Sequence, residues 1–173
     1  NGNSYNLQPT KFKVITNSRE IKELNVVSSG DFIIASPINI GKLEINMAGS
    51  GNILLEKKVE GNKLEINLAS SGSVVASNID LAGIECSLAG SGYIQIAGKA
   101  DRAEYNLAAS GNIKAYKCVT GKTECNIAGS GNIQTHTRNQ LEANIVGSGN
   151  VYYKGNPTTS KSIIGSGKLK SAN

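Results

Sequence analysis

Seven glutamates recur about every twenty residues and are the side chains in this sequence best placed to do chemistry together. Each stands seven positions before the glycine that closes a repeated Ser-Gly pair. They are Glu23, Glu44, Glu65, Glu85, Glu104, Glu124 and Glu142. A file of carboxylates offers oxygen ligands for calcium, or an acid and a base for cleaving a polysaccharide.

The residues that precede these glutamates favour a third interpretation, a solvated stripe of charge. A cation stands two positions before four of them, on the same side of an extended strand: Lys42, Lys63, Arg102 and Lys122. Each cation can pair with the glutamate of its own repeat and with that of the next. Exposed pairs of this kind are worth about half a kcal/mol. We therefore expect neither a metal site nor a catalytic centre here.

The other reactive side chains form no recognised catalytic arrangement. Cys86 and Cys125 occupy an apolar position of the repeat, so we expect them to point inward, two repeats apart and too distant for a disulfide. Cys118 is buried or free, and no CxxC pair or histidine cluster predicts zinc. His136 is the single histidine, and no serine is distinguished as a nucleophile. The sequence predicts no catalytic residue, metal ligand or cofactor.

One repeated phrase carries all of these residues. LEINMAGSGNI at 43–53 returns at 64–74, 84–94, 103–113, 123–133 and 141–151, with degenerate copies at 22–32 and 159–169. The closing glycines of the eight copies serve as anchors and are 18 to 21 residues apart. They are Gly30, Gly51, Gly72, Gly92, Gly111, Gly131, Gly149 and Gly167. A period near twenty indicates a solenoid whose units bury their faces against each other.

Within each copy the apolar residues alternate with polar ones, which predicts a strand with one buried face. Leu43, Ile45 and Met47 alternate with Glu44 and Asn46. A turn follows, whose glycines and asparagines tolerate positive φ, and then a second short strand. Because crossovers between parallel strands are right-handed, we predict an all-β fold: a right-handed parallel β-helix of about eight coils. It forms a single domain over 1–173, with repeats over 21–170 and residues 1–20 as a cap or cover.

Asparagines form a second file, five positions before the anchors. They are Asn25, Asn46, Asn67, Asn106, Asn126 and Asn144, with Ser87 and Ser162 as substitutes. Stacked asparagines can bond amide to amide along such a rod, so we expect a structural ladder. The asparagines after the anchors are interpreted as turn residues: Asn52, Asn112, Asn132 and Asn150.

Composition restricts the partners. The net charge of +5 comes from cations interleaved with acids, which argues against a nucleic-acid surface. No apolar run approaches the roughly 18 residues of a membrane span. The chain has no Trp, two Phe and one Met, so we expect a thin aliphatic core.

The AGSGNI and GSGNV phrases behind an L-E-x-N-hydrophobic strand resemble the bacterial auto-transporter adhesin "head GIN" domain. The resemblance extends over roughly 20–169. It implies a right-handed β-helix on an exported, often lipid-anchored protein of the cell envelope, at the cell surface, at the outer membrane or in the periplasm. It brings no catalytic residues.

The outward position three residues after each anchor changes character along the chain. It is apolar in the first copies, at Ile33, Leu54 and Val75. Such a strip should be covered, and we expect the cover to be the segment containing Phe12, Val14 and Ile15, with a homo-oligomer or a docked partner as alternatives.

In later copies the same face is aromatic and polar, which suits glycan stacking, although tyrosine also simply favours strands. The candidate ligand residues are Tyr93, Gln95, Lys114, Tyr116, Gln134, His136 and Tyr152, with Lys154 beside them.

We therefore expect a non-enzymatic, adhesin-like scaffold that binds glycan or surface protein through this face. The alternatives are a polysaccharide-degrading β-helix enzyme and a passive structural rod. Loop length varies by at most three residues per coil, which argues against the walled groove of an enzyme.

Overall fold

The structure is a computed structural model that describes residues 21–27 and 29–173, and these residues form strands without any helix. The twelve strands are β1 (Glu23–Val26), β2 (Phe32–Ile34), β3 (Ile38–Met47), β4 (Asn52–Leu55), β5 (Val59–Leu68), β6 (Ser73–Leu88), β7 (Tyr93–Leu107), β8 (Asn112–Gly129), β9 (Asn132–Gly147), β10 (Asn150–Lys154), β11 (Thr158–Gly165) and β12 (Lys168–Ser171).

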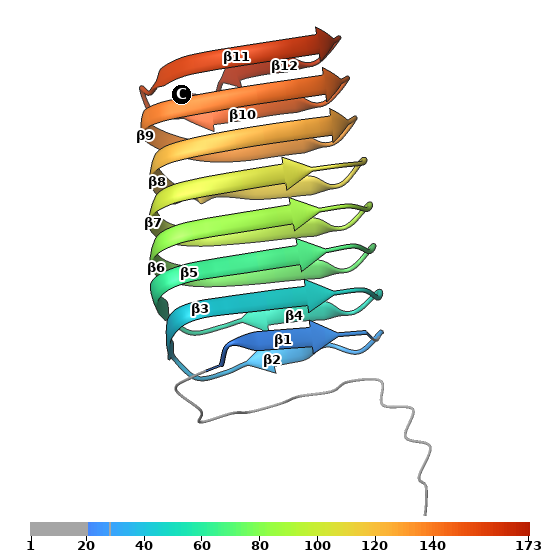
Figure 1. Cartoon of the computed structure of the whole chain (residues 1–173), viewed down its shortest axis with the longest axis vertical. Coiled ribbons are helices and arrows are strands. Elements are labelled where there is room, and N and C mark those ends of the chain that lie inside the picture. Colours follow the sequence, from blue (N-terminus) through green and yellow to red (C-terminus); the bar gives the residue numbers. More distant parts are fainter. Residues whose placement is uncertain (1–20, 28) are drawn as a thin grey trace, which may run out of the picture.

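The strands stack in parallel, with each repeat placed over the next. β3 pairs with β5 so that Glu44 lies beside Glu65 and Asn46 beside Asn67. Figure 1 shows two layers: the front strands run to the right, the back strands return to the left, and the chain rises from one coil to the next. This path is a right-handed solenoid, as predicted. The eight anchor glycines enclose seven full turns of 18 to 21 residues, close to the eight coils expected.

Four long strands bend around the edge that joins the layers. The start of β6 pairs with β4 in the back layer, and its end pairs with β5 in the front layer. β7, β8 and β9 follow the same course, and the register shifts where they bend, for example between Ala76 and Ile79. A coil is therefore a back strand, a bend, a front strand and a tight Ser-Gly turn.

The core lies between the two layers and is narrow. Leu43 and Ile45 from β3 belong to one hydrophobic cluster with Ile53 and Leu55 from β4, and all four are fully buried. The aliphatic core expected from the sequence is present in the early coils. In later coils Cys86 and Cys125 replace isoleucine at equivalent positions, and Ala143 follows in the next coil.

Four buried threonines depart from the aliphatic expectation. The Thr120 and Thr123 hydroxyls are 2.6 Å apart, the Thr137 hydroxyl donates to Thr123 Oγ1 at 2.7 Å, and Thr135 lies 3.3 Å from Thr137. Thr120 also donates to the carbonyl of His136 at 3.1 Å. Because the hydroxyls bond each other, the cost of burying them is offset. The alternation of inward and outward residues along a strand predicts that these side chains point into the core, but it does not predict the hydrogen bonds among them.

The anchor glycines are required for a reason that the sequence did not suggest. Positive φ was expected at these turns, and Gly129, Gly147 and Gly165, each two residues before an anchor, adopt it, whereas no anchor glycine does among the described residues. A Cβ at Gly131 would instead lie 2.1 Å from the carbonyl oxygen of Gly111, and one at Gly72 would lie 2.1 Å from that of Gly51. Successive turns stack backbone on backbone, so the α-carbon must be bare.

The apolar strip of the first coils lies on the outside of the back layer. Ile33, Leu54 and Val75 lie side by side in β2, β4 and β6, and each is half-buried. The predicted cover, with Phe12, Val14 and Ile15, and the whole of the predicted cap at 1–20 lie outside the described residues.

Candidate ligand faces

The seven glutamates project from the front layer, and we call this surface the glutamate face. Lys42 pairs with Glu44 at 3.2 Å and with Glu65 at 3.0 Å. Lys63 pairs with Glu65 at 3.5 Å and with Glu85 at 2.7 Å. The predicted sharing of a cation between two coils is thus confirmed for these two lysines. The hydrogen bond from Lys42 lowers the pKa of Glu65, and the bond to Glu85 raises the pKa of Lys63.

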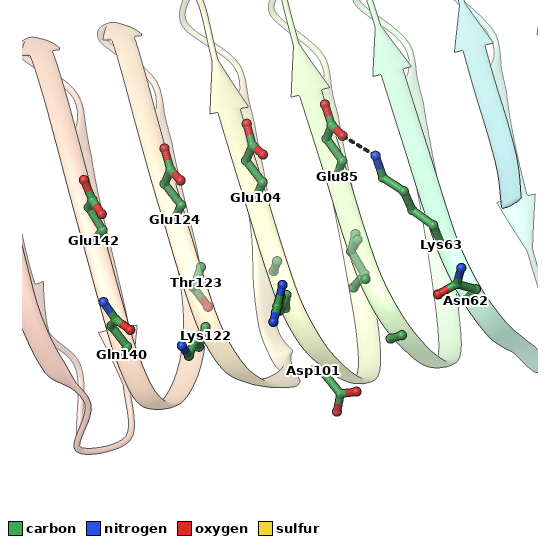
Figure 2. Close-up of a pocket in the computed structure, with 15 residues that line it drawn as sticks. Asn62, Lys63, Glu85, Asp101, Glu104, Lys122, Thr123, Glu124, Gln140 and Glu142 are labelled. Carbon is green, nitrogen blue, oxygen red and sulfur yellow. Dashed lines mark hydrogen bonds and ion pairs between the residues drawn. The ribbon is translucent and has the colours of Figure 1, made fainter.

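The later half of the glutamate face is arranged differently. Within the described residues, Arg102 and Lys122 make no ion pair, contrary to the expectation from their spacing. Figure 2 shows Glu85, Glu104, Glu124 and Glu142 in a file along one open depression of about 750 Å³, with Lys122 set back toward the bend. The described residues contain no group of three His, Cys, Asp or Glu side chains placed to hold a metal ion.

The asparagine file forms the predicted ladder. Asn46 donates to Asn25 at 3.0 Å, and Asn67 donates to Asn46 at 2.9 Å. After the interruption at Ser87 the ladder resumes, with Asn126 donating to Asn106 at 2.9 Å and Asn144 to Asn126 at 3.0 Å. The same amides hold the glutamates of their own coils, as when Asn106 donates to Glu104 at 2.9 Å. The ladder therefore orients the carboxylates as well as joining coils.

A second, shorter ladder runs where the back strands begin. Asn150 donates to Asn132 at 3.0 Å, and Asn132 donates to Asn112 at 3.3 Å. Asn52 donates to Asp31 at 2.7 Å in the first coils. These residues were interpreted as turn residues alone. They also stack, because the fixed register brings equivalent turn positions together.

The candidate ligand residues all lie on the outside of the back layer, and we call this surface the tyrosine face. Gln95, Lys114, Gln134 and Tyr152 are consecutive partners across β7, β8, β9 and β10. Tyr93 is 37% exposed. Tyr116 and His136 are half-buried, and Lys154 pairs with His136 across β10 and β9. The seven residues singled out from the sequence therefore share one surface.

Lysines cover the tyrosine rings of this face. The ammonium of Lys114 lies 4.6 Å from the ring centre of Tyr93, that of Lys154 lies 5.1 Å from Tyr116, and that of Lys170 lies 5.8 Å from Tyr152. These are cation–π distances. Burial, with the nearby hydroxyl of Tyr152, raises the pKa of Tyr116. The sequence placed tyrosines and lysines on one face but gave no indication of this pairing.

The three cysteines are buried and free, as expected for Cys86 and Cys125. They surround Tyr105, whose strand lies between those of Cys86 and Cys125. The Tyr105 hydroxyl is buried and has no hydrogen-bond partner among the described residues, and burial raises its pKa well above the usual value. Burial raises the pKa of Cys118 to about 12 and raises those of Cys86 and Cys125 as well.

An apolar file along the glutamate face was missed. The residue three positions before each anchor is apolar and exposed, and Val27, Val146 and Ile164 are 81%, 54% and 68% exposed. Alanines occupy the same place in the other coils: Ala48, Ala69, Ala89, Ala108 and Ala128. From β5 to β9 the file borders a shallow apolar depression of about 420 Å³ beside the asparagine ladder. The sequence did contain a signal for this file, because every copy has an apolar residue at this outward-facing position.

Among the described residues, no helix has the length and apolarity needed to cross a membrane.

Comparison with known proteins gives close structural relatives. A crystal structure named a putative lipid binding protein from Parabacteroides distasonis is 53% identical, with a TM-score of 0.87 over 88% of this chain and 62% of that one. A putative adhesin from Parabacteroides merdae is 33% identical, with a TM-score of 0.82 over 88% and 64%. A second putative adhesin from P. distasonis is 29% identical, with a TM-score of 0.81 over 87% and 64%. No curated protein matched.

The chain thus spans a little over three fifths of the length of these solved chains. The family model described as "Putative auto-transporter adhesin, head GIN domain" matches residues 43–157, which is most of the repeat region. The resemblance found in the repeated phrases is confirmed: this chain belongs to the head GIN domain family.

Proposed function

We propose that the protein is a non-enzymatic, adhesin-like scaffold of the cell envelope, and that its tyrosine face binds glycan or a surface protein. The tyrosine face is the observation that carries the proposal. It presents aromatic rings, amides and ammonium groups from four successive strands on one regular surface. Membership of a family named for adhesins supports the same role.

The regular coil supports a binding role over a catalytic one. Turns of similar length stack over each other, so no loop rises to wall a groove around the glutamates in the described coils. The carboxylates of the early coils are engaged by lysines, and those at Glu104, Glu124 and Glu142 accept hydrogen bonds from asparagines. A polysaccharide-cleaving enzyme needs an acid and a base in different environments, whereas these side chains have nearly equivalent ones.

The family supports export to the cell surface, the outer membrane or the periplasm, and we propose that location for this protein. The first relative described above is named a putative lipid binding protein. Lipids therefore belong in any ligand screen, although apolar side chains fill the space between the two layers.

A glycan and extracellular-matrix array tests the proposal. We expect the 173-residue chain to bind one class of immobilised ligand, and the double variant Tyr116→Ala/Tyr152→Ala to lose most of that binding. Lys122→Ala on the glutamate face is the control and should bind like the parent protein. Equal binding by parent and double variant, or no binding by the parent protein to any glycan, matrix protein or lipid, would contradict the proposal.

A further inference from the structure

The charge of the molecule is unevenly distributed. Residues 81–173 contain ten Lys and Arg against five Asp and Glu, whereas residues 1–80 contain eight of each. The whole net charge of +5 therefore arises in the later coils, which carry the tyrosine face.

The acids of the later coils avoid the tyrosine face. Four of them, Glu85, Glu104, Glu124 and Glu142, lie on the glutamate face (Figure 2), and the fifth, Asp101, lies at the bend. The outward residues of the back layer from β7 onward include no carboxylate. Apart from His136, they are tyrosines, glutamines, asparagines and lysines. Lysine ammonium groups on this surface therefore have no acidic neighbour on the same face.

The tyrosines hold these ammonium groups in place. Lys114, Lys154 and Lys170 each reach toward an earlier coil and lie over a ring. An exposed cation–π contact contributes about 0.5–1 kcal/mol, enough to favour one position of a flexible side chain without neutralising its charge. A neutral sugar that stacked on a ring would have to displace the lysine first. A negatively charged group can bind the ammonium where it already is.

The spacing suits an extended ligand that follows the rod. Lys114 and Lys170 stand in one column, separated by Gln134 and Tyr152, so three strand spacings lie between them, about 14 Å. Lys154 lies in the neighbouring column. Gln134 supplies an amide donor and acceptor between Lys114 and Lys170, and Gln95 supplies another on the far side of Lys114. Such amides suit hydroxyl groups between successive anionic groups.

We propose that the tyrosine face binds a linear anionic polysaccharide, carboxylated or sulfated, lying along the rod with its anionic groups on Lys114, Lys154 and Lys170. This inference rests on the proposed function and specifies the class of ligand. Single-stranded nucleic acid fits less well, because its bases stack on open ring faces and here lysines cover the rings. The rings act as supports for cations.

Binding to defined polymers tests the inference. The probes are polygalacturonate and heparin as carboxylated and sulfated polysaccharides, with dextran as the neutral one, measured by biolayer interferometry from 50 to 500 mM NaCl. We expect both polyanions to bind, dextran not to bind, and affinity to fall as salt rises. The triple variant Lys114→Gln/Lys154→Gln/Lys170→Gln should bind polyanions about tenfold more weakly or worse.

A matched variant removes the same charge from outside the tyrosine face. Arg102→Gln/Lys122→Gln/Arg138→Gln changes two exposed cations of the front layer and one at the bend and should change affinity less than about twofold. Equal losses in the two triple variants would overturn the inference, because attraction would then depend on net charge alone. Tighter binding to single-stranded DNA or to phosphatidylglycerol vesicles than to either polysaccharide would also overturn it.

Different results would overturn the proposed class of ligand and the proposed binding function. The protein could instead bind dextran or an uncharged glycan of the array. If Tyr116→Ala/Tyr152→Ala abolishes that binding and the lysine triple variant leaves it intact, the inference is overturned and the proposed function is supported. Absence of binding to every glycan, matrix protein and lipid would overturn both. Circular dichroism and melting curves show whether each variant is folded, so that a loss of binding can be attributed to the substituted side chains.

Discussion

Tyr105 shows how one large side chain fits a core built for smaller ones. Its neighbours in the preceding and following coils are Cys86 and Cys125, where the early coils carry Ile45 and Ile66. Small side chains above and below leave room for the ring, so the volume is shared among three coils. The thiols are therefore best understood as packing residues.

The three thiols should be inert in the folded protein. Burial raises the pKa of Cys118 to about 12 and raises those of the other two, and only the thiolate reacts readily. We expect negligible labelling by a disulfide reagent such as DTNB at pH 8, and three equivalents after unfolding in guanidinium. A thiol that reacts within seconds in the native protein would show that this part of the core is open.

The glutamate face should make stability depend on pH. The hydrogen bond from Lys42 lowers the pKa of Glu65 in the folded protein. The contribution of Glu65 is therefore present at neutral pH, above its unfolded pKa, and is lost as the pH falls through the lowered folded value. Lys63 has a raised pKa, so its contribution is complete below its unfolded pKa and is lost at alkaline pH.

Urea unfolding at pH 7 and pH 3 measures this dependence. Glu65→Gln should narrow the difference in unfolding free energy between the two pH values, by an amount within the roughly 0–1 kcal/mol typical of exposed pairs. Glu142→Gln, which removes a glutamate without an ion pair among the described residues, is the comparison. A larger narrowing in Glu142→Gln would contradict the assignment.

At the scale of the element, the stacked turn is the part least tolerant of change. A Cβ at Gly131 would meet the Gly111 carbonyl oxygen at 2.1 Å, and backbone on both sides cannot move without breaking the register. We expect Gly131→Ala to lower the unfolding free energy by about 2–3 kcal/mol or more. Gly83→Ala is the control, because the nearest atom to its added Cβ is Lys63 Cγ at 4.0 Å, and its melting temperature should stay close to that of the parent.

Strands, register and ladders could be predicted because each follows from spacing alone. Alternation places Ile45 inward and Asn46 outward, and a constant period places Asn46 beside Asn67. Features that depend on side-chain reach could not be obtained in this way. Lys63 and Lys122 occupy equivalent positions, yet only Lys63 pairs with a glutamate, and offsets do not specify rotamers.

The same limit applies to the candidate ligand face. Offsets placed its residues on one surface correctly, but the approach of lysines to rings depends on torsions within long side chains. The bonding among the buried threonines likewise depends on the width of the core at the bend, which changes where the register shifts between Ala115 and Val119.

At the scale of the whole molecule, stability should decline toward the C-terminal coil. β7 and β8 are each paired on both sides, whereas β11 and β12 pair on one side only, and nearly all residues of β11 and β12 are exposed. In a solenoid each coil is stabilised by its neighbours, and poorly covered hydrogen bonds open first. Hydrogen–deuterium exchange should therefore be fastest in β11 and β12 and slowest in β7 and β8. Uniform protection across these strands would indicate that the rod opens only as one unit.

The hydrogen bonds between coils, such as that from the Ala69 amide to the Met47 carbonyl at 2.9 Å, point along the length of the rod. Tension applied from one end to the other pulls in line with these bonds and loads one coil at a time. A rod stretched in this way peels open stepwise, and each step frees 18 to 21 residues, about 60–70 Å of extended chain. A pull across the rod, delivered through a ligand spread over several strands, shears many bonds at once. The force needed to unfold the protein therefore depends on the points at which the force is applied.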